Sequence, residues 1–225
     1  SVSRLHALTI CFAVIALSTP ALGGGPPQKD VQNYKLKYRI KRDGAHIGAY
    51  RFDVREAEHH YNFKAKLDIE VTIFGFTVYS LRHQRSEQWR NNRLVQLDGE
   101  SVYNDDERYD FRLTRNDDQG HTLQVNDQTR KLDSRVFSFS PRQPGEWQNA
   151  RLITLKGDAD AITLQKVGTT QLMIDGTKYD TRHFRQKGDV VRNLWYDVSG
   201  HLLKLSYKKD GAKITFVRTA FIKGK

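Results

Sequence analysis

The stretch YNFKAKLDIEVTIFG, residues 61–75, alternates apolar and polar side chains with a period of two. This alternation is typical of a half-buried β-strand, in which successive side chains point to opposite faces. The stretch therefore predicts one strand with an inward apolar row and an outward polar row. The inward row is Phe63, Ala65, Leu67, Ile69, Val71 and Ile73, and the outward row is Asn62, Lys64, Lys66, Asp68, Glu70 and Thr72.

The same period recurs on both sides of this stretch, from residue 34 almost to the end of the chain. Clusters of Asn, Asp and Gly separate the apolar segments, and these residues favour tight turns. Short strands at regular spacing predict an all-β antiparallel meander. The region 133–158 interrupts the rhythm, since Pro141 and Pro144 exclude a central strand there. Residues 148–155 are expected to form a short helix, so the domain should contain at most one or two helices.

The N-terminal residues predict export. A charged start, an apolar run over residues 7–17 and small residues up to Gly23 are typical of a secretory signal peptide, which we expect to comprise residues 1–23. The apolar run is shorter than the roughly 20 residues that a spanning helix needs, although an uncleaved membrane anchor is the alternative. Residues 24–33 are expected to form a flexible lead-in and residues 34–225 a single β domain. The predicted location is the periplasm.

Charge and cysteine content limit the chemistry. The formal net charge is +11, and loss of Arg4 with the signal would leave +10. A basic exported protein should attract anionic partners, including an anionic membrane surface. Lysine and arginine are scattered along outward strand faces rather than clustered with stacking aromatics, so nucleic acid is not an expected partner. The only cysteine, Cys11, lies in the predicted signal, which excludes disulfides and thiol catalysis in the mature chain.

Three segments carry a resemblance to a known family. They are YRIKRDGAHIGAYRFDV at residues 38–54, FTVYSLRHQRSEQWRNNRLVQL at 76–97 and RHFRQKGDVVRNLWYDVSGHLLKLSY at 182–207. Together they resemble a family of exported bacterial β-rich proteins known only as a domain of unknown function. That family is distantly similar to the half-barrels of lipoprotein carriers, which hold acyl chains in an apolar hollow. The resemblance implies that the meander curves into a half-barrel or open barrel.

The segment YSLRHQRSEQW, residues 79–89, holds the main candidate site. On a strand its odd positions share one face, which starts apolar and ends polar, so this face should line the interior with its polar end near the mouth of the hollow. The alternative is a strand that leaves the core with its charges paired across strands. A second polar cluster, YDTRHFR, lies at residues 179–185. The candidate ligand-binding residues are Phe63, Leu67, Ile69, Tyr79 and Leu81 for an apolar tail, and His83, Arg85, Glu87, Trp89, Arg182, His183, Trp195 and Asp197 around a polar end.

The expected role is non-catalytic binding. The chain has no Gly-x-Ser-x-Gly, no His-Glu-x-x-His and no phosphate-cradling glycine loop, and neither a metal nor another cofactor is predicted. We expect a monomer that binds a lipid-like or amphipathic envelope component, or a partner protein, on its concave face. One alternative is a hydrolase of envelope glycans or lipids, in which His83 and Glu87 would converge with Asp197 or His183. Another is a structural scaffold whose own side chains fill the interior.

Overall fold

The chain folds into one long antiparallel sheet. The computed structural model describes residues 31–117, 120–133 and 135–224, and these contain fifteen strands and no helix. The predicted signal peptide and most of the lead-in lie outside the described residues. The first eight strands are β1 (Gln32–Arg42), β2 (Ala45–Glu56), β3 (His60–Ile73), β4 (Phe76–Arg90), β5 (Arg93–Tyr103), β6 (Glu107–Arg115), β7 (His121–Val125) and β8 (Gln128–Leu132). The other seven are β9 (Arg135–Ser138), β10 (Trp147–Ile153), β11 (Ala159–Ile174), β12 (Thr177–Lys187), β13 (Arg192–Tyr196), β14 (Leu202–Lys209) and β15 (Ala212–Lys223).

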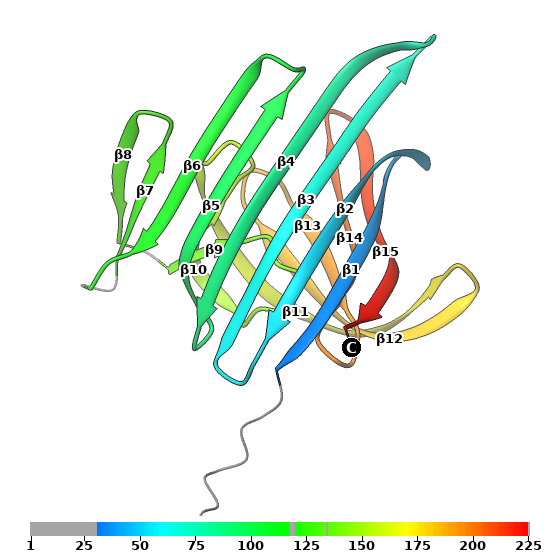
Figure 1. The fold of residues 1–225 in the computed structure, drawn as a ribbon. Coiled ribbons are helices and arrows are strands. Elements are labelled where there is room, and N and C mark those ends of the chain that lie inside the picture. Colours follow the sequence, from blue (N-terminus) through cyan, green and yellow to red (C-terminus); the bar gives the residue numbers. More distant parts are fainter. Residues whose placement is uncertain (1–30, 118–119, 134, 225) are drawn as a thin grey trace, which may run out of the picture.

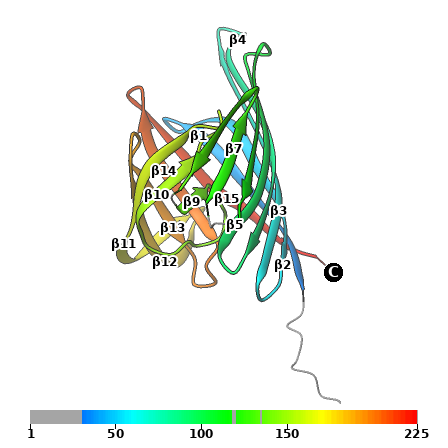
Figure 2. The same cartoon turned by 90° about the vertical axis from the view of Figure 1, so that its left-hand side faces the viewer.

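The sheet curls into a nearly closed barrel. β8 and β9 are its two edge strands, and the first and last strands of the chain, β1 and β15, pair in its middle. All neighbouring pairs are antiparallel except β9 and β10, which run parallel. Figures 1 and 2 show the walls curving round a common inside, with an open seam between the edge strands. The predicted all-β open barrel is confirmed.

The two-residue period accounts for the wall. Along β3, Tyr61, Phe63, Ala65 and Leu67 are buried, whereas the polar residues between them are exposed. The inward rows of all walls meet in one hydrophobic core with fully buried members on both sides of the barrel, such as Leu36 and Leu194. No described helix is long and apolar enough to cross a membrane.

Two predictions of local structure are wrong, one of a helix and one of a buried side chain. Residues 148–155 form no helix, because most of this segment belongs to β10, where Ala150 and Leu152 are buried and pair with β11. Ile73 does not point into the core, because the end of β3 extends beyond the neighbouring strands and leaves this side chain half exposed. Periodicity identifies the face of a side chain but not whether the rest of the barrel reaches it.

The irregular region after β9 enters the barrel. We call residues 138–143 the plug. The ring of Phe139 lies 5.6 Å from that of Tyr50 and within 6.2 Å of that of Phe216, both of which are inward residues of the wall. The plug then follows the β13–β14 turn, where Leu202 N donates to the Pro141 carbonyl over 2.7 Å. The chain thus places its own segment in the lumen.

Candidate functional site

β4 presents its odd face to the interior, as the alternation predicts. Leu81, His83, Arg85, Glu87 and Trp89 are all buried. Their position along the barrel differs from the prediction, since the polar end of the row is enclosed under the plug instead of lying at the rim. The polar side chains therefore have partners within the protein.

Glu87 is the centre of this enclosed network. One of its carboxylate oxygens, Oε2, accepts hydrogen bonds from Trp89 Nε1 over 2.7 Å and from Ser138 Oγ over 2.6 Å. The other, Oε1, lies 3.1 Å from Arg85 Nε. Burial raises the pKa of Glu87, and the Arg85 charge and the two hydrogen bonds oppose that shift.

Arg85 connects the wall to the plug. Its Nη2 donates to the carbonyl of Phe139, and its guanidinium carbon lies 5.6 Å from the centre of the Phe63 ring. Burial by itself would lower the pKa of Arg85, but Tyr50 and Glu87 outweigh burial and raise it. The Arg85–Glu87 pair therefore holds the plug from the β4 side.

His83 lies one step further along the same face. Its Nδ1 is 2.8 Å from Ser101 Oγ, and that hydroxyl donates to the carbonyl of Leu155. The imidazole is parallel to the Phe111 ring at 6.1 Å. Burial first, and Arg85 second, lower the pKa of His83 to about 3, so the ring is neutral at physiological pH.

The predicted tail-binding residues lie in the core or at its edge. Phe63, Leu67 and Leu81 are buried among other side chains, whereas Ile69 and Tyr79 are partly buried. Phe63, for example, has the Phe52 ring 5.5 Å away. Their role in holding a ligand stays a prediction.

The second predicted cluster is divided between the two faces of the sheet. His183 and Trp195 stack at 4.7 Å on the outer face, because their neighbours Phe184 and Leu194 point inward. Lys204 lies 5.4 Å above the Trp195 ring. The structure does not bring this pair together with the enclosed network of β4.

Asp197 and Arg182 lie at the lower end of the barrel. Asp197 Oδ2 accepts from Arg218 Nη1 over 2.8 Å, and Arg182 donates to Gln143 and to the Val198 carbonyl. Glu87, His83, Asp197 and His183 thus have four separate sets of partners, and the convergence expected of a hydrolase is not found among them. The described residues also contain no group of three or more His, Cys, Asp or Glu side chains placed to hold a metal ion.

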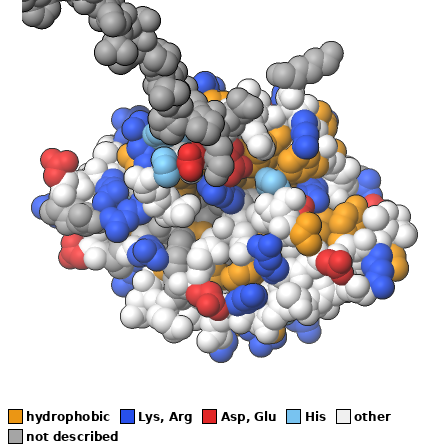
Figure 3. Space-filling view, turned by 90° about the horizontal axis from the view of Figure 1, so that it is seen from below, with side chains coloured by type: hydrophobic (Ala, Val, Ile, Leu, Met, Phe, Trp, Pro, Cys, Tyr) orange, Lys and Arg blue, Asp and Glu red, His pale blue; other side chains and the backbone are white. Residues whose placement is uncertain are grey.

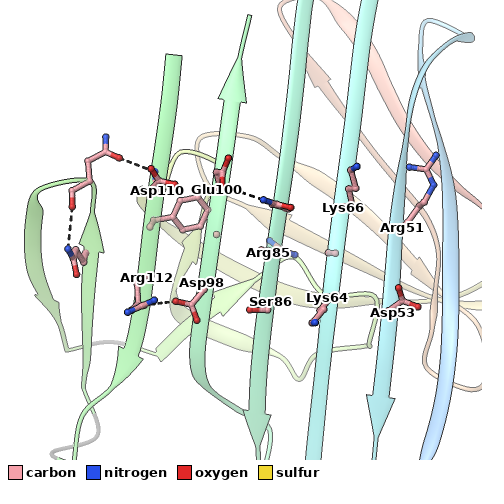
Figure 4. A pocket seen from close by; sticks show the side chains of 16 residues that line it. Arg51, Asp53, Lys64, Lys66, Arg85, Ser86, Asp98, Glu100, Asp110 and Arg112 are labelled. Atoms are coloured by element: carbon pink, nitrogen blue, oxygen red, sulfur yellow. Dashed lines mark hydrogen bonds and ion pairs between the residues drawn. The ribbon is translucent and has the colours of Figure 1, made fainter. Parts of the chain in front are cut away.

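The outer face of β2–β7 carries a shallow groove of about 810 Å³ (Figure 4). Its cationic and acidic side chains are mixed: β3 contributes lysines, β5 contributes acids, and β2 and β6 each contribute one of each sign. Arg112 pairs with Asp98, for example, and Gln84 donates to Glu100 over 3.3 Å. The polar even face of β4 is therefore a solvated ladder, whose exposed pairs contribute little to stability. The charged lining residues are Arg51, Asp53, Lys64, Lys66, Asp98, Glu100, Asp110, Arg112 and Arg85, the last of which is buried.

A different hollow opens at the lower end of the barrel, where the plug meets the β2–β3 and β4–β5 turns. We call it the lower mouth. It has a volume of about 570 Å³ and includes the aromatic residues Tyr61, Trp89 and Phe137 in its lining. A second hollow of about 940 Å³ adjoins it and shares Glu58, Arg142 and Gln143. Figure 3 shows this end, with cationic, acidic and histidine side chains interspersed.

Cations outnumber acids around the lower mouth and the adjoining hollow. Arg142 is central, since its guanidinium carbon lies 5.4 Å from the centre of the Tyr61 ring and its Nε lies 3.4 Å from Glu56 Oε1. Burial lowers the pKa of the nearby His201, with Asp197 and Glu56 opposing. The cations are Arg93, Arg135, Arg142, Arg182, Arg218 and Lys223, and the acids are Glu56, Glu58 and Asp197.

Sequence reasoning missed Arg142, Arg218 and the mouth as a whole. Arg142 lies between two prolines in the irregular segment, where no period indicates which way a side chain points. The available signal was its place in a long connection, because binding residues are often carried on loops that a rigid scaffold positions.

The comparisons with known proteins agree with this fold. Residues 38–219 match the family described as "Domain of unknown function (DUF6134)". A similar solved structure is the crystal structure of a beta-barrel-like protein of domain of unknown function DUF1849 from Brucella abortus, with a TM-score of 0.64 and 7% sequence identity. The match covers 86% of this chain and 98% of that chain. A comparison with curated proteins gave no match.

Proposed function

This chain belongs to the family described as domain of unknown function DUF6134, and we propose that it is an exported, non-catalytic binding protein. Its lower mouth receives the anionic end of an amphipathic envelope molecule. The observation that carries the proposal is the lower mouth itself, where aromatic side chains lie beside an excess of guanidinium groups.

Guanidinium chemistry favours a phosphate or carboxylate as the bound group. Arginine presents planar, bidentate donors that match the oxygens of either anion, and it also stacks on aromatic rings. Arg142 already lies over Tyr61 in the free protein. Its partner Glu56 also accepts a hydrogen bond from Tyr34 over 2.8 Å, so Glu56 would keep a partner if Arg142 turned to a ligand.

The plug supports a binding site at the mouth rather than deeper in the barrel. It separates the mouth from the apolar interior, because Ser138 and Phe139 are bound to Glu87 and Arg85 while Pro141 and Gln143 are bound to the β13–β14 turn. A ligand tail would therefore lie along Tyr61, Trp89 and Phe137, and deeper entry would require the plug to move. The proposal thus places the ligand lower than the alternation of the sequence alone suggests.

The test uses a short-chain phosphatidic acid that stays monomeric, with the matching phosphatidylcholine for comparison. Calorimetry should detect binding of the phosphatidic acid alone. Arg142→Ala should weaken this binding by at least about tenfold, since a charged hydrogen bond contributes roughly 1.5–3 kcal/mol. Arg142→Lys should recover part of the loss.

Arg112→Ala is the matched control, because it removes a cation from the balanced outer groove. It should leave binding unchanged. Equal affinity for both lipids, or no effect of Arg142→Ala in a variant with an unchanged melting temperature, would overturn the proposal. Complete absence of binding would favour the scaffold role instead.

A further inference from the structure

The β3–β4 hairpin extends beyond the barrel at the end opposite the lower mouth. Pairing of β3 with β2 ends at Ile69, and pairing of β4 with β5 ends at Leu81. We call residues 71–80 the tip hairpin; residues 71–79 pair only with each other, and Ser80, at its base, pairs with Glu70. Figure 1 shows its turn projecting beyond the ends of β1 and β2.

The tip hairpin is apolar where a solvated turn should be polar. Its sequence, VTIFGFTVYS, contains no charged residue, although 28% of the chain is charged. Phe74 is 95% exposed and Phe76 77% exposed, and Ile73 and Val78 are half exposed. An unbroken apolar end of this kind is an aggregation liability, which proteins usually blunt with charges.

Phe74 also occupies an unfavourable backbone conformation. Nine described residues other than glycine have positive φ, and eight of them are Asn or Asp. The ninth is Phe74, with φ at 50°. This left-handed region costs energy for a bulky side chain, and Asn or Asp is the usual choice in such turns. Phe74 gains no compensating contact within the fold, since its side chain is almost fully exposed, so its role lies outside the fold.

We propose that the tip hairpin inserts Phe74 and Phe76 into the head-group region of an anionic membrane. Strands alternate in direction, so the β1–β2 and β14–β15 turns lie at the same end of the barrel as the tip hairpin. Four exposed cations flank these turns, and none makes an ion pair with a described residue: Arg42, Lys208, Lys209 and Lys213. Cations beside an apolar projection match a surface with anionic head groups over an apolar layer.

Acidic side chains at this end reduce this charge excess without removing it, because exposed Asp43 and Asp210 lie in the same two turns and leave two more cations than acids there. On the other flank of the tip hairpin, Asp105 pairs with Arg82 over 2.8 Å and Glu107 with Lys156 over 3.1 Å. The size of the tip also favours a lipid surface over a protein partner. A stable protein interface uses about 20–30 residues a side, whereas the uncharged tip has ten. Shallow insertion needs only a few apolar side chains.

The test is sedimentation with vesicles of equal parts phosphatidylglycerol and phosphatidylethanolamine. The wild-type chain should partition onto these vesicles and much less onto phosphatidylcholine vesicles. The double variant Phe74→Asn, Phe76→Ser should lower the partition coefficient by at least about tenfold, since each buried phenylalanine contributes about that factor. In a Phe74→Trp variant, tryptophan emission should shift to shorter wavelength on binding.

Met173→Ser is the matched control, because Met173 is an exposed apolar residue of a different hairpin, β11–β12, which lies beside Arg39 and Lys204 on the outer wall. It should leave partitioning unchanged. Partitioning that the double variant does not reduce would overturn the proposal, as would self-association that the double variant abolishes. Arg142→Ala, which tests the lower mouth, should not alter partitioning, so the two proposals fail separately.

Discussion

Arg85 and Glu87, two residues apart on β4, form an ion pair of 3.1 Å inside the barrel, with side chains 2% and 0% exposed. Residues at this spacing on a strand share a face, and the pair needs no cross-strand partner to satisfy its charges. The pair instead leaves Arg85 Nη2 and Glu87 Oε2 available for the plug. A buried pair of this kind specifies where the plug lies, and stability depends on both members being present.

Glu87→Ala should lower the free energy of unfolding by about 3–5 kcal/mol, because it leaves the Arg85 charge buried without a partner. Urea unfolding measures the loss. Asp98→Ala is the control, since it breaks an exposed pair with Arg112 and should cost about 1 kcal/mol or less. A loss at Glu87 no larger than at Asp98 would contradict the role assigned to the pair.

Stability should fall on acidification below about pH 6.5, in part through His83. The pKa of His83 is about 3 in the folded protein and 6.5 when unperturbed, so between these values the unfolded state binds the extra proton. Each pH unit in that window removes at most about 1.4 kcal/mol. Unfolding free energies of the wild type and His83→Gln, compared between pH 7 and pH 4.5, should show a shallower decline for the variant. Parallel declines would show that His83 is not the group responsible.

Phe139→Ala should open the lumen beside Tyr50. Replacing a core phenylalanine with alanine costs about 3–5 kcal/mol, and the half-buried position of Phe139 favours the lower end of that range. The cavity should also increase the binding of a small apolar dye, which fluorescence detects. Val198→Ala, at an exposed residue of the β13–β14 turn, should change neither quantity. Unchanged dye binding by Phe139→Ala would indicate that the ring does not fill the lumen.

Phe74→Asn should stabilise the isolated protein, although it removes an apolar side chain. Asparagine tolerates the left-handed conformation, and relief of this strain is expected to raise the free energy of unfolding by about 1 kcal/mol. Phe76→Asn makes the same chemical change at an exposed strand position and should give no gain. A destabilised Phe74→Asn variant would show that the ring has contacts within the fold.

The sequence predicts the strands of the barrel wall better than it predicts the plug and the side chains that the plug covers. Alternation along residues 61–89 identifies the inward face, and His83, Arg85 and Glu87 are indeed buried on it. It does not predict their depth, because the plug that covers them has no period. For the same reason Arg142 was missed, since its position depends on where the plug leaves the lumen. The exposure of Ile73 was not predictable either, because it depends on the lengths of the neighbouring strands.

Pairing of β1 with β15 joins the two ends of the described chain, with Tyr34 opposite Lys223. Contacts between residues so distant in sequence make folding slow, because a long loop must close before the pairing stabilises it. The wall cannot be completed until the last strand has been synthesised. Until then β1 and β14 are unprotected edges that can recruit other chains. Completion of the wall is therefore expected late in folding, and an intermediate that lacks the β1–β15 pairing exposes two strand edges at once.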